Sequence, residues 1–163
     1  VTGEPLPVQR LEPAIPAAFA ALSVDGWAAA AHAILTTDTR PKALSVCFNC
    51  DGRDYVVTGI AKGSGMIRPN MATMLAYIAT DTAVEQTLLQ EMLAELVDIS
   101  FNRITVDGDT STNDACLLLA TGAAGNIPLA DSASILYGAL REAVEEGEGI
   151  EQDGWSRPRA RRP

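Results

Sequence analysis

Tyr55-Val-Val-Thr-Gly-Ile-Ala61 is an apolar run rich in β-branched residues, and a second apolar run, Thr73-Met-Leu-Ala-Tyr-Ile-Ala79, follows it. Both have the length and composition of strands. The eleven residues between them, Lys62-Gly-Ser-Gly-Met-Ile-Arg-Pro-Asn-Met-Ala72, form a Gly-rich segment that leads directly into Thr73. The sequence therefore predicts two strands joined by a Gly-rich loop, around which the rest of the fold assembles.

Further strands are expected on both sides of this pair. Asp51-Gly52 is a hairpin signal that would join a strand over Ala43–Phe48 to the run at Tyr55–Ala61. Downstream, the pattern predicts an apolar strand over Ala115–Ala120 and a short strand over Arg103–Val106.

Two helices are predicted after the central pair. The clearer one covers Val84–Ile99, and Thr82-Ala-Val-Glu85 has the pattern of a capping box at its start. Its apolar stripe comprises Leu88, Leu89, Met92, Leu93, Leu96 and Val97. The last helix is expected over Ser132–Glu146, with Gly147 ending it.

The N-terminal region is expected to be less regular. Residues 1–16 are Pro-rich and predicted to be extended or looped, and Ala17–Leu22 is predicted to form a helical turn. Asp25 can cap an Ala-rich helix over Gly26–Leu35. Because strands and helices do not alternate strictly along the chain, the pattern favours the α+β class.

Composition limits the class of protein. The 163 residues are 47% hydrophobic but only 5% aromatic, which suits one domain with an aliphatic core. A net charge of −9 argues against a nucleic-acid partner, although four of the twelve Lys and Arg side chains fall in the last seven residues. No apolar run approaches the ~18 residues of a membrane helix, and no signal-peptide pattern is seen. Three cysteines without a disulfide pattern favour a reducing, cytoplasmic setting.

Three motifs contain residue types that could carry chemistry, and a structural interpretation is favoured for two of them. His32 is the only histidine and lies in an Ala-rich helix, which favours packing or a surface position over a catalytic triad. For Cys47-Phe-Asn-Cys50, a structural zinc would need about two further soft ligands, and only Cys116 and His32 remain. The pair is also expected at a strand end, whereas a redox pair normally lies at a helix start. Asp107–Asp114 fails as a calcium loop, because Thr112 and Leu118 replace the required Gly and Glu. That loop either braces its own backbone or lines a polar pocket.

The Lys62–Ala72 segment has two interpretations on physical grounds. In one it is a surface loop with a turn at Pro69-Asn70. In the other, the sharp bend strains the Ala72–Thr73 peptide, so that the Thr73 hydroxyl attacks the Ala72 carbonyl and the resulting ester is hydrolysed. The freed Thr73 α-amine can then serve as the general base, and Lys62 would supply a positive charge for a carboxylate or an oxyanion. The residues alone leave both interpretations open.

Several blocks of the sequence resemble the ornithine acetyltransferase family, the bifunctional glutamate N-acetyltransferases of arginine biosynthesis. The blocks follow the order of the family over residues 3–149, and they are long and specific. They are Gly3-Glu-Pro-Leu-Pro7, Thr36-Thr-Asp-Thr39, Ala61-Lys-Gly-Ser-Gly-Met-Ile67, Pro69-Asn-Met-Ala-Thr-Met-Leu75 and Ser100-Phe-Asn-Arg-Ile-Thr-Val-Asp-Gly-Asp-Thr-Ser-Thr-Asn-Asp114.

The resemblance implies a layered αββα sandwich of the self-cleaving type within the α+β class. It implies cleavage between Ala72 and Thr73, after which Thr73 carries acetyl from N-acetylornithine to glutamate as a threonine ester. Thr39, Lys62 and Glu148 would bind these small-molecule substrates. No cofactor or metal is implied, although acetyl-CoA serves some members as acetyl donor. The two fragments would stay together and pair into a heterotetramer in the cytoplasm, with no nucleic acid or membrane as partner.

The resemblance also implies a chain that is incomplete at both ends. The family's oxyanion Thr-Gly pair would precede Val1, and Thr2-Gly3 is not assigned that role. Beyond residue 149 an Arg- and Pro-rich tail replaces the family pattern. We expect a partial catalytic domain over residues 1–149 and a divergent, disordered basic tail over residues 150–163. The alternatives are a truncated, non-catalytic family remnant, or an amidase or aminopeptidase on a related self-cleaving fold.

Overall fold

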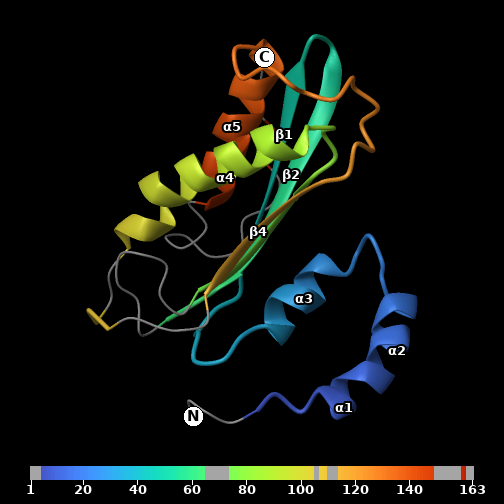
Figure 1. The fold of residues 1–163 in the computed structure, drawn as a ribbon, viewed down its shortest axis with the longest axis vertical. Coiled ribbons are helices and arrows are strands. Elements are labelled where there is room, and N and C mark those ends of the chain that lie inside the picture. The colour runs from blue at the N-terminus through green and yellow to red at the C-terminus, as the bar shows by residue number, and fades with distance from the viewer. Residues whose placement is uncertain (1–4, 65–73, 105–106, 110–113, 149–158, 161–163) are drawn as a thin grey trace.

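A central sheet with the strand order β4-β3-β2-β1 organises the chain (Figure 1). The computed structural model describes residues 5–64, 74–104, 107–109, 114–148 and 159–160. Neighbours β1, β2 and β3 are antiparallel, β4 runs parallel to β3, and a two-residue strand, β5, runs parallel to β1 at the far edge. The bounds are β1 Lys42–Cys50, β2 Arg53–Lys62, β3 Leu75–Thr80, β4 Ala115–Ala120 and β5 Arg159–Ala160.

The hairpin between β1 and β2 turns at Asp51 and Gly52, which have φ angles of 51° and 77°. Positive φ at both central residues is the type I′ geometry, for which Asp-Gly is a preferred pair. The predicted hairpin is therefore confirmed. Its strands are longer than predicted, because pairing continues from Cys50 and Arg53 beside the turn to Lys42 at the opposite end of β1.

Helix α4 (Gln86–Ile99) carries the predicted apolar stripe, with Leu88, Met92, Leu96 and Val97 buried. The predicted capping box is wrong. Glu85 is the extended N-cap residue without a side-chain capping bond, and the helix begins after it. Thr82 is fully buried and accepts a hydrogen bond from Thr80 at 3.0 Å. Tertiary pairing keeps the backbone before α4 extended, since Val84 forms a parallel bridge with Leu129.

Helix α5 (Ile135–Glu148) begins three residues later than predicted and does not end before Gly147. Ser134 acts at its start, where its Oγ accepts the Tyr137 N–H at 3.2 Å. The residues before it form a turn, in which Asp131 Oδ1 accepts the Ala133 N–H at 2.8 Å. The predicted strand at Arg103–Val106 is also not borne out at Arg103, which belongs to the 3-10 helix η2 (Phe101–Arg103).

The two faces of the sheet are covered unequally. Helices α4 and α5 pack on one face, where Val46, Val57 and Ile78 meet Met92 and Leu140 in the main core. Since side chains alternate along a strand, the intervening residues point to the opposite face. Among the described residues, only the short helix α3 (Trp27–Ala33) covers that face (Figure 1). It packs there through a small cluster of Ala31, Ala43 and Ile60.

From Val8 to Ala20 the chain is helical rather than looped. Helix α1 (Val8–Leu11), the 3-10 helix η1 (Glu12–Ala14) and α2 (Ile15–Ala20) follow one another. Pro13 and Pro16 sit in the first turns of η1 and α2, where a missing N–H costs nothing. That explains why the proline content misled the prediction. The predicted cap at Asp25 is also wrong, because Gly26 is the N-cap residue of α3 and makes no side-chain capping bond.

Mixed helices and strands around one sheet confirm the α+β class. None of the helices in the described ranges is long and apolar enough to cross a membrane.

Candidate active site

Four strands begin or end at the same end of the sheet. The register pairs Lys42 with Ala61, Lys62 with Leu75, and Leu75 with Ala115. Strands β1, β3 and β4 therefore begin where β2 ends. Four of the sequence blocks that carry the family resemblance flank these ends, so they converge here although they are far apart in the chain. We call this end of the strands the site end of the sheet.

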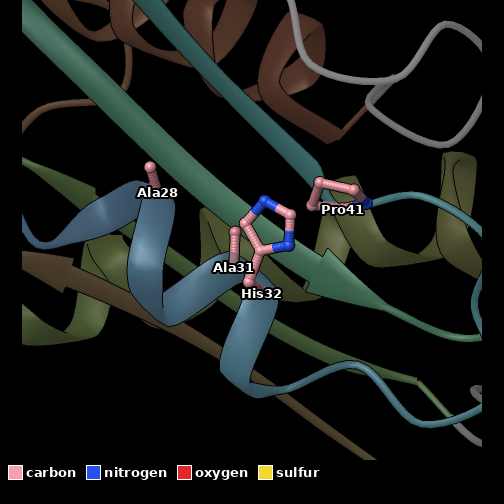
Figure 2. Close-up of a pocket in the computed structure, with 4 residues that line it drawn as sticks. All are labelled: Ala28, Ala31, His32 and Pro41. Carbon is pink, nitrogen blue, oxygen red and sulfur yellow. The ribbon is translucent and has the colours of Figure 1, made fainter.

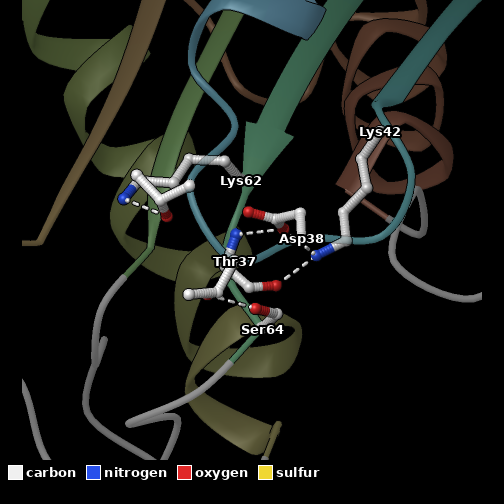
Figure 3. A network of polar contacts seen from close by, with 7 residues as sticks. Thr37, Asp38, Lys42, Lys62 and Ser64 are labelled. Atoms are coloured by element: carbon white, nitrogen blue, oxygen red, sulfur yellow. Dashed lines mark hydrogen bonds and ion pairs between the residues drawn. The ribbon is translucent and has the colours of Figure 1, made fainter.

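The Asp38 carboxylate is the centre of a polar cluster at the site end (Figure 3). Its side chain is only 1% exposed. Oδ1 accepts hydrogen bonds from the Gly63 N–H at 2.9 Å and from Lys42 Nζ at 3.0 Å, and Lys42 Nζ also donates to the Gly63 carbonyl. The loop before β1 is thereby tied to the backbone that follows β2. We call the group the Asp38 cluster; its members are Thr36, Thr37, Asp38, Lys42, Lys62, Gly63 and Ser64.

Hydroxyl groups connect the remaining members of the Asp38 cluster, including Lys62. Thr37 Oγ1 and Ser64 Oγ form a hydrogen bond of 2.6 Å, and Lys62 Nζ lies 3.5 Å from Thr36 Oγ1. The second distance is long for a hydrogen bond. Because an ammonium group has three donors, Lys62 retains capacity to bind an anionic partner.

The charged groups of the Asp38 cluster differ in whether they form an ion pair. Burial raises the pKa of the Asp38 carboxyl, but the hydrogen bond from Gly63 and the hydrogen bond and charge of Lys42 outweigh it, so that the pKa lies below its ordinary 3.8. Asp38 is therefore an anion at neutral pH and forms an ion pair with Lys42. Within the described part of the chain, Lys62 makes no ion pair.

A second carboxylate holds the residue that precedes β3. Asp114 Oδ1 accepts the Met74 N–H at 2.8 Å, and the Met74 carbonyl accepts the Ala115 N–H at 3.0 Å. The Met74 side chain is 1% exposed and packs in a small core with Ala76 and Phe101. Both backbone groups and the side chain of Met74 are thus held in place.

The predicted site residues are only partly described. Ala72 and Thr73 lie outside the described residues, so the cleavage site and the nucleophile stay predictions. Lys62, a member of the Asp38 cluster, is half-buried at the end of β2. Thr39 follows Asp38 and is exposed, without a hydrogen bond to another described residue. Glu148 is the last residue of α5, and its side chain lies outside the described part.

The two cysteines of the CxxC motif lie in different environments. Cys47 is exposed and Cys50 is buried, and all three cysteines are free thiols. Cys47 and Cys50 are three residues apart in a strand, so their side chains point to opposite faces. Burial and the charge of Asp51 raise the pKa of the Cys50 thiol, which makes it a poor nucleophile. Among the described residues, no group of three His, Cys, Asp or Glu side chains could hold a metal ion.

His32 lies on the surface, as predicted. It is exposed on α3 and lines a cavity of about 340 Å³ together with Ala28, Ala31 and Pro41 (Figure 2). The three neighbours are apolar and provide no carboxylate to orient the imidazole. None of the described residues that line this cavity could help His32 to act as a catalytic base.

Sequence reasoning missed the roles of Asp38, Lys42 and Asp114. Asp38 and Asp114 lie inside quoted family blocks, but no contact was predicted for either. A usable signal was present, because each carboxylate precedes a predicted strand within a loop rich in Ser, Thr and Asn, whose side chains commonly bind backbone groups. The partners Gly63 and Met74 lie 25 and 40 residues away in sequence, and only the register reveals them.

Fold and site end together define an α+β protein with a buried, charged cluster where its central strands begin and end. Comparison with known proteins gives its family. The model of the ArgJ family matches residues 1–154. The chain belongs to the ArgJ family, which confirms the family membership predicted from the sequence blocks.

Two curated relatives carry the name Arginine biosynthesis bifunctional protein ArgJ. The protein of Pseudomonas syringae pv. tomato (strain ATCC BAA-871 / DC3000) is 54% identical over 159 residues, which cover 94% of this chain and 39% of the relative. The protein of Pseudomonas fluorescens (strain Pf0-1) is 53% identical over 146 residues, which cover 90% of this chain and 36% of the relative. The chain therefore spans well under half the length of these relatives.

Among solved structures, the chain is similar to the crystal structure of Arginine biosynthesis bifunctional protein argJ from Bacillus halodurans. The sequence identity is 39% and the TM-score is 0.40, and the match covers 48% of this chain and 38% of that one.

Proposed function

We propose that this chain forms part of an acetyltransferase of arginine biosynthesis that moves an acetyl group from N-acetylornithine to glutamate. Family membership supports the proposal, as do two relatives more than half identical to the chain that are named for arginine biosynthesis. Because the chain spans 39% of the first relative, the activity is stated for this chain as a proposal only.

The observation that carries the proposal is the register at the site end. Lys62 is the last residue of β2 and pairs with Leu75 at the start of β3. Thr73 precedes Leu75 by two residues, and Met74 between them is held by Asp114. A cation at the end of β2 therefore lies opposite the start of β3, two residues along the sequence from the proposed nucleophile.

Activation is proposed to begin with cleavage of the chain. The Thr73 hydroxyl oxygen attacks the Ala72 carbonyl carbon, the Ala72–Thr73 C–N bond breaks, and the hydroxyl proton ends on the Thr73 nitrogen. Water then hydrolyses the ester, which leaves an Ala72 carboxylate and restores the hydroxyl. The new α-amine of Thr73 lies beside that hydroxyl and can act as its general base.

Acetyl transfer then proceeds in two balanced steps. The Thr73 oxygen attacks the acetyl carbon of N-acetylornithine while the α-amine takes the hydroxyl proton, and ornithine leaves with that proton. The amine of glutamate next attacks the acetyl-threonine ester, and N-acetylglutamate leaves as the hydroxyl is restored. Acetyl-CoA is proposed as an alternative acetyl donor. Lys62 would bind a substrate carboxylate, and Thr39 and Glu148 would complete the substrate contacts.

The remaining expectations concern assembly. We propose that a second sheet covers the face opposite α4 and α5 and completes an αββα sandwich. Leu117 and Leu119 support this idea, because they are 42% and 52% exposed on that face. The two cleavage fragments would stay together and pair into a heterotetramer in the cytoplasm.

Intact-mass analysis with a transfer assay tests the proposal. The purified chain should yield two fragments, ending at Ala72 and starting at Thr73, whose masses sum to the whole chain plus one water. Incubation with N-acetylornithine and glutamate should give N-acetylglutamate. Thr73→Ala is the negative control and the Pseudomonas syringae relative the positive control. If the chain stays uncut and transfers nothing while that relative does both, the chain is a non-catalytic remnant. Release of acetate to water without glutamate acetylation would instead indicate an amidase.

A further inference from the structure

We propose that Asp114 is a positioning residue, which orients the nucleophile Thr73 through the backbone of Met74. The proposal rests on the function proposed above and adds a residue to it. Asp114 touches neither substrate nor the reacting atoms in this account. It acts only through the N–H group that it binds.

The geometric argument starts from the peptide bond. The Met74 N–H that donates to Asp114 Oδ1 at 2.8 Å is part of the peptide group that joins Thr73 to Met74. A peptide group is planar, and its six atoms include the Cα atoms of both residues. In this proposal, the hydrogen bond fixes the plane of the peptide group through which Met74 connects to Thr73.

Asp114 extends the parallel ladder between β3 and β4 by one acceptor, which binds the Met74 N–H. The backbone register begins at Leu75 and Ala115, and the Ala115 N–H binds the Met74 carbonyl. The Met74 N–H lies before the first pair, and the Asp114 side chain accepts it instead. Hydrogen bonds to an ionised acceptor are stronger than neutral ones, so a carboxylate suits this role.

Cleavage makes this anchor more important. Once the Ala72–Thr73 bond is broken, Thr73 is a chain end, and chain ends lose order unless they are tied down. On the other side of the cleaved segment, Asp38 holds Gly63 with a second carboxylate. The Asp114–Met74 bond is then the first fixed point next to the nucleophile, and catalysis depends steeply on how the nucleophile is held.

Strand β3 offers a matched control at its other end. Asp81 follows Thr80, and its Oδ1 accepts the Val56 N–H at 3.0 Å. This contact has the same chemistry and comparable burial, and it adjoins the end of β3 opposite the site end. Asp81→Ala therefore reproduces the loss of a carboxylate–backbone bond without touching the Thr73–Met74 peptide.

The experiment compares cleavage and acetyl transfer in the wild type with Asp114→Ala, Asp114→Asn and Asp81→Ala. Asp114→Ala should lower kcat on the order of 10²-fold with little change in KM, because misplacement of a reacting group costs about that much. Asp114→Asn keeps an oxygen acceptor and should recover most of the rate. Asp81→Ala should lower Tm to a similar extent and leave kcat unchanged. A folded Asp114→Ala protein with wild-type kcat would overturn the proposal, as would an equal loss in Asp81→Ala.

Amide hydrogen exchange gives a readout that needs no activity. In the uncut Thr73→Ala chain, the Met74 amide should be protected, and adding Asp114→Ala should remove that protection selectively. A Met74 amide that exchanges equally fast in both chains would contradict the anchor itself. A wild-type chain that neither cuts nor transfers would overturn the proposed function and, with it, the role for Asp114, whereas an active chain that tolerates Asp114→Ala overturns only this inference.

Discussion

Asp38 shows how a single buried carboxylate can tie two distant segments together at the residue scale. Its side chain is almost fully buried, and it stays ionised because Lys42 and the Gly63 N–H both bind Oδ1. Burial of an unpaired charge would be strongly unfavourable. The pairing therefore fixes the loop before β1 against the end of β2, and so helps to hold Lys62 in position.

Stability should depend on pH through Asp38. The pKa of Asp38 is lower in the folded protein than its ordinary 3.8, so the stabilisation is present above about pH 4 and is lost as pH falls through the folded-state pKa. Asp38→Asn should lower the free energy of unfolding at neutral pH by about 1–3 kcal/mol. That difference should shrink below pH 3.8. Urea unfolding of both proteins across this range measures it, and a difference that stays constant into acid would contradict the assignment.

At the site end, the sequence predicted which residues could carry chemistry better than it predicted which residues contact one another. Lys62 is predicted as a site residue because a lone cation follows a predicted strand and precedes a Gly-rich segment, and the structure places it as the last residue of β2. Asp38 was overlooked because its meaning depends on Gly63, which becomes its neighbour only when β1 and β2 pair. A local sequence pattern indicates which residues could carry chemistry, whereas the long-range register of the strands decides which of them become neighbours.

Replacing a glycine by alanine should destabilise the protein in the hairpin and stabilise it in helix α5. A Cβ added at Gly52 or at Gly138 would meet no atom within 4 Å, so space does not distinguish them. Gly52 has a φ of 77° in the hairpin, and Gly52→Ala should cost about 1–2 kcal/mol. Gly138 lies exposed in α5, and Gly138→Ala should stabilise the protein by about 0.4–1 kcal/mol. Thermal unfolding of the two variants tests this, and changes of the same sign would refute the backbone argument.

Element types were predicted better than element starts. The hairpin, β4 and the stripe of α4 followed from alternation and helical periodicity, which are local properties. The start of α4 was wrong because Asn126 Oδ1 accepts the Ala83 N–H at 2.8 Å and keeps that stretch extended. A capping pattern competes with such tertiary hydrogen bonds, and here the bond formed across 43 residues prevails.

At the scale of the whole molecule, one face of the sheet is covered by helices and the other is partly exposed. Helices α4 and α5 cover it with a continuous core, while the opposite face carries α3 and leaves Leu117 and Leu119 exposed. Helices α1 and α2 likewise expose large side chains, such as Ile15 and Phe19 at 62% and 74%. Apolar surface on this scale commonly marks a surface that packs against another part of a protein.

Neighbouring residues of β4 test this asymmetry. Leu118 packs against the main core, so Leu118→Thr should lower the free energy of unfolding by about 2 kcal/mol or more. Leu119 is 52% exposed, and Leu119→Thr should change it by no more than about 0.5 kcal/mol. Urea unfolding of each variant gives the values. In a relative of full length, where the proposed second sheet would bury this face, the residue aligned with Leu119 should become as sensitive as the one aligned with Leu118. Equal sensitivity in the present chain would show that its open face is already covered, and continued tolerance in the longer protein would argue against the second layer.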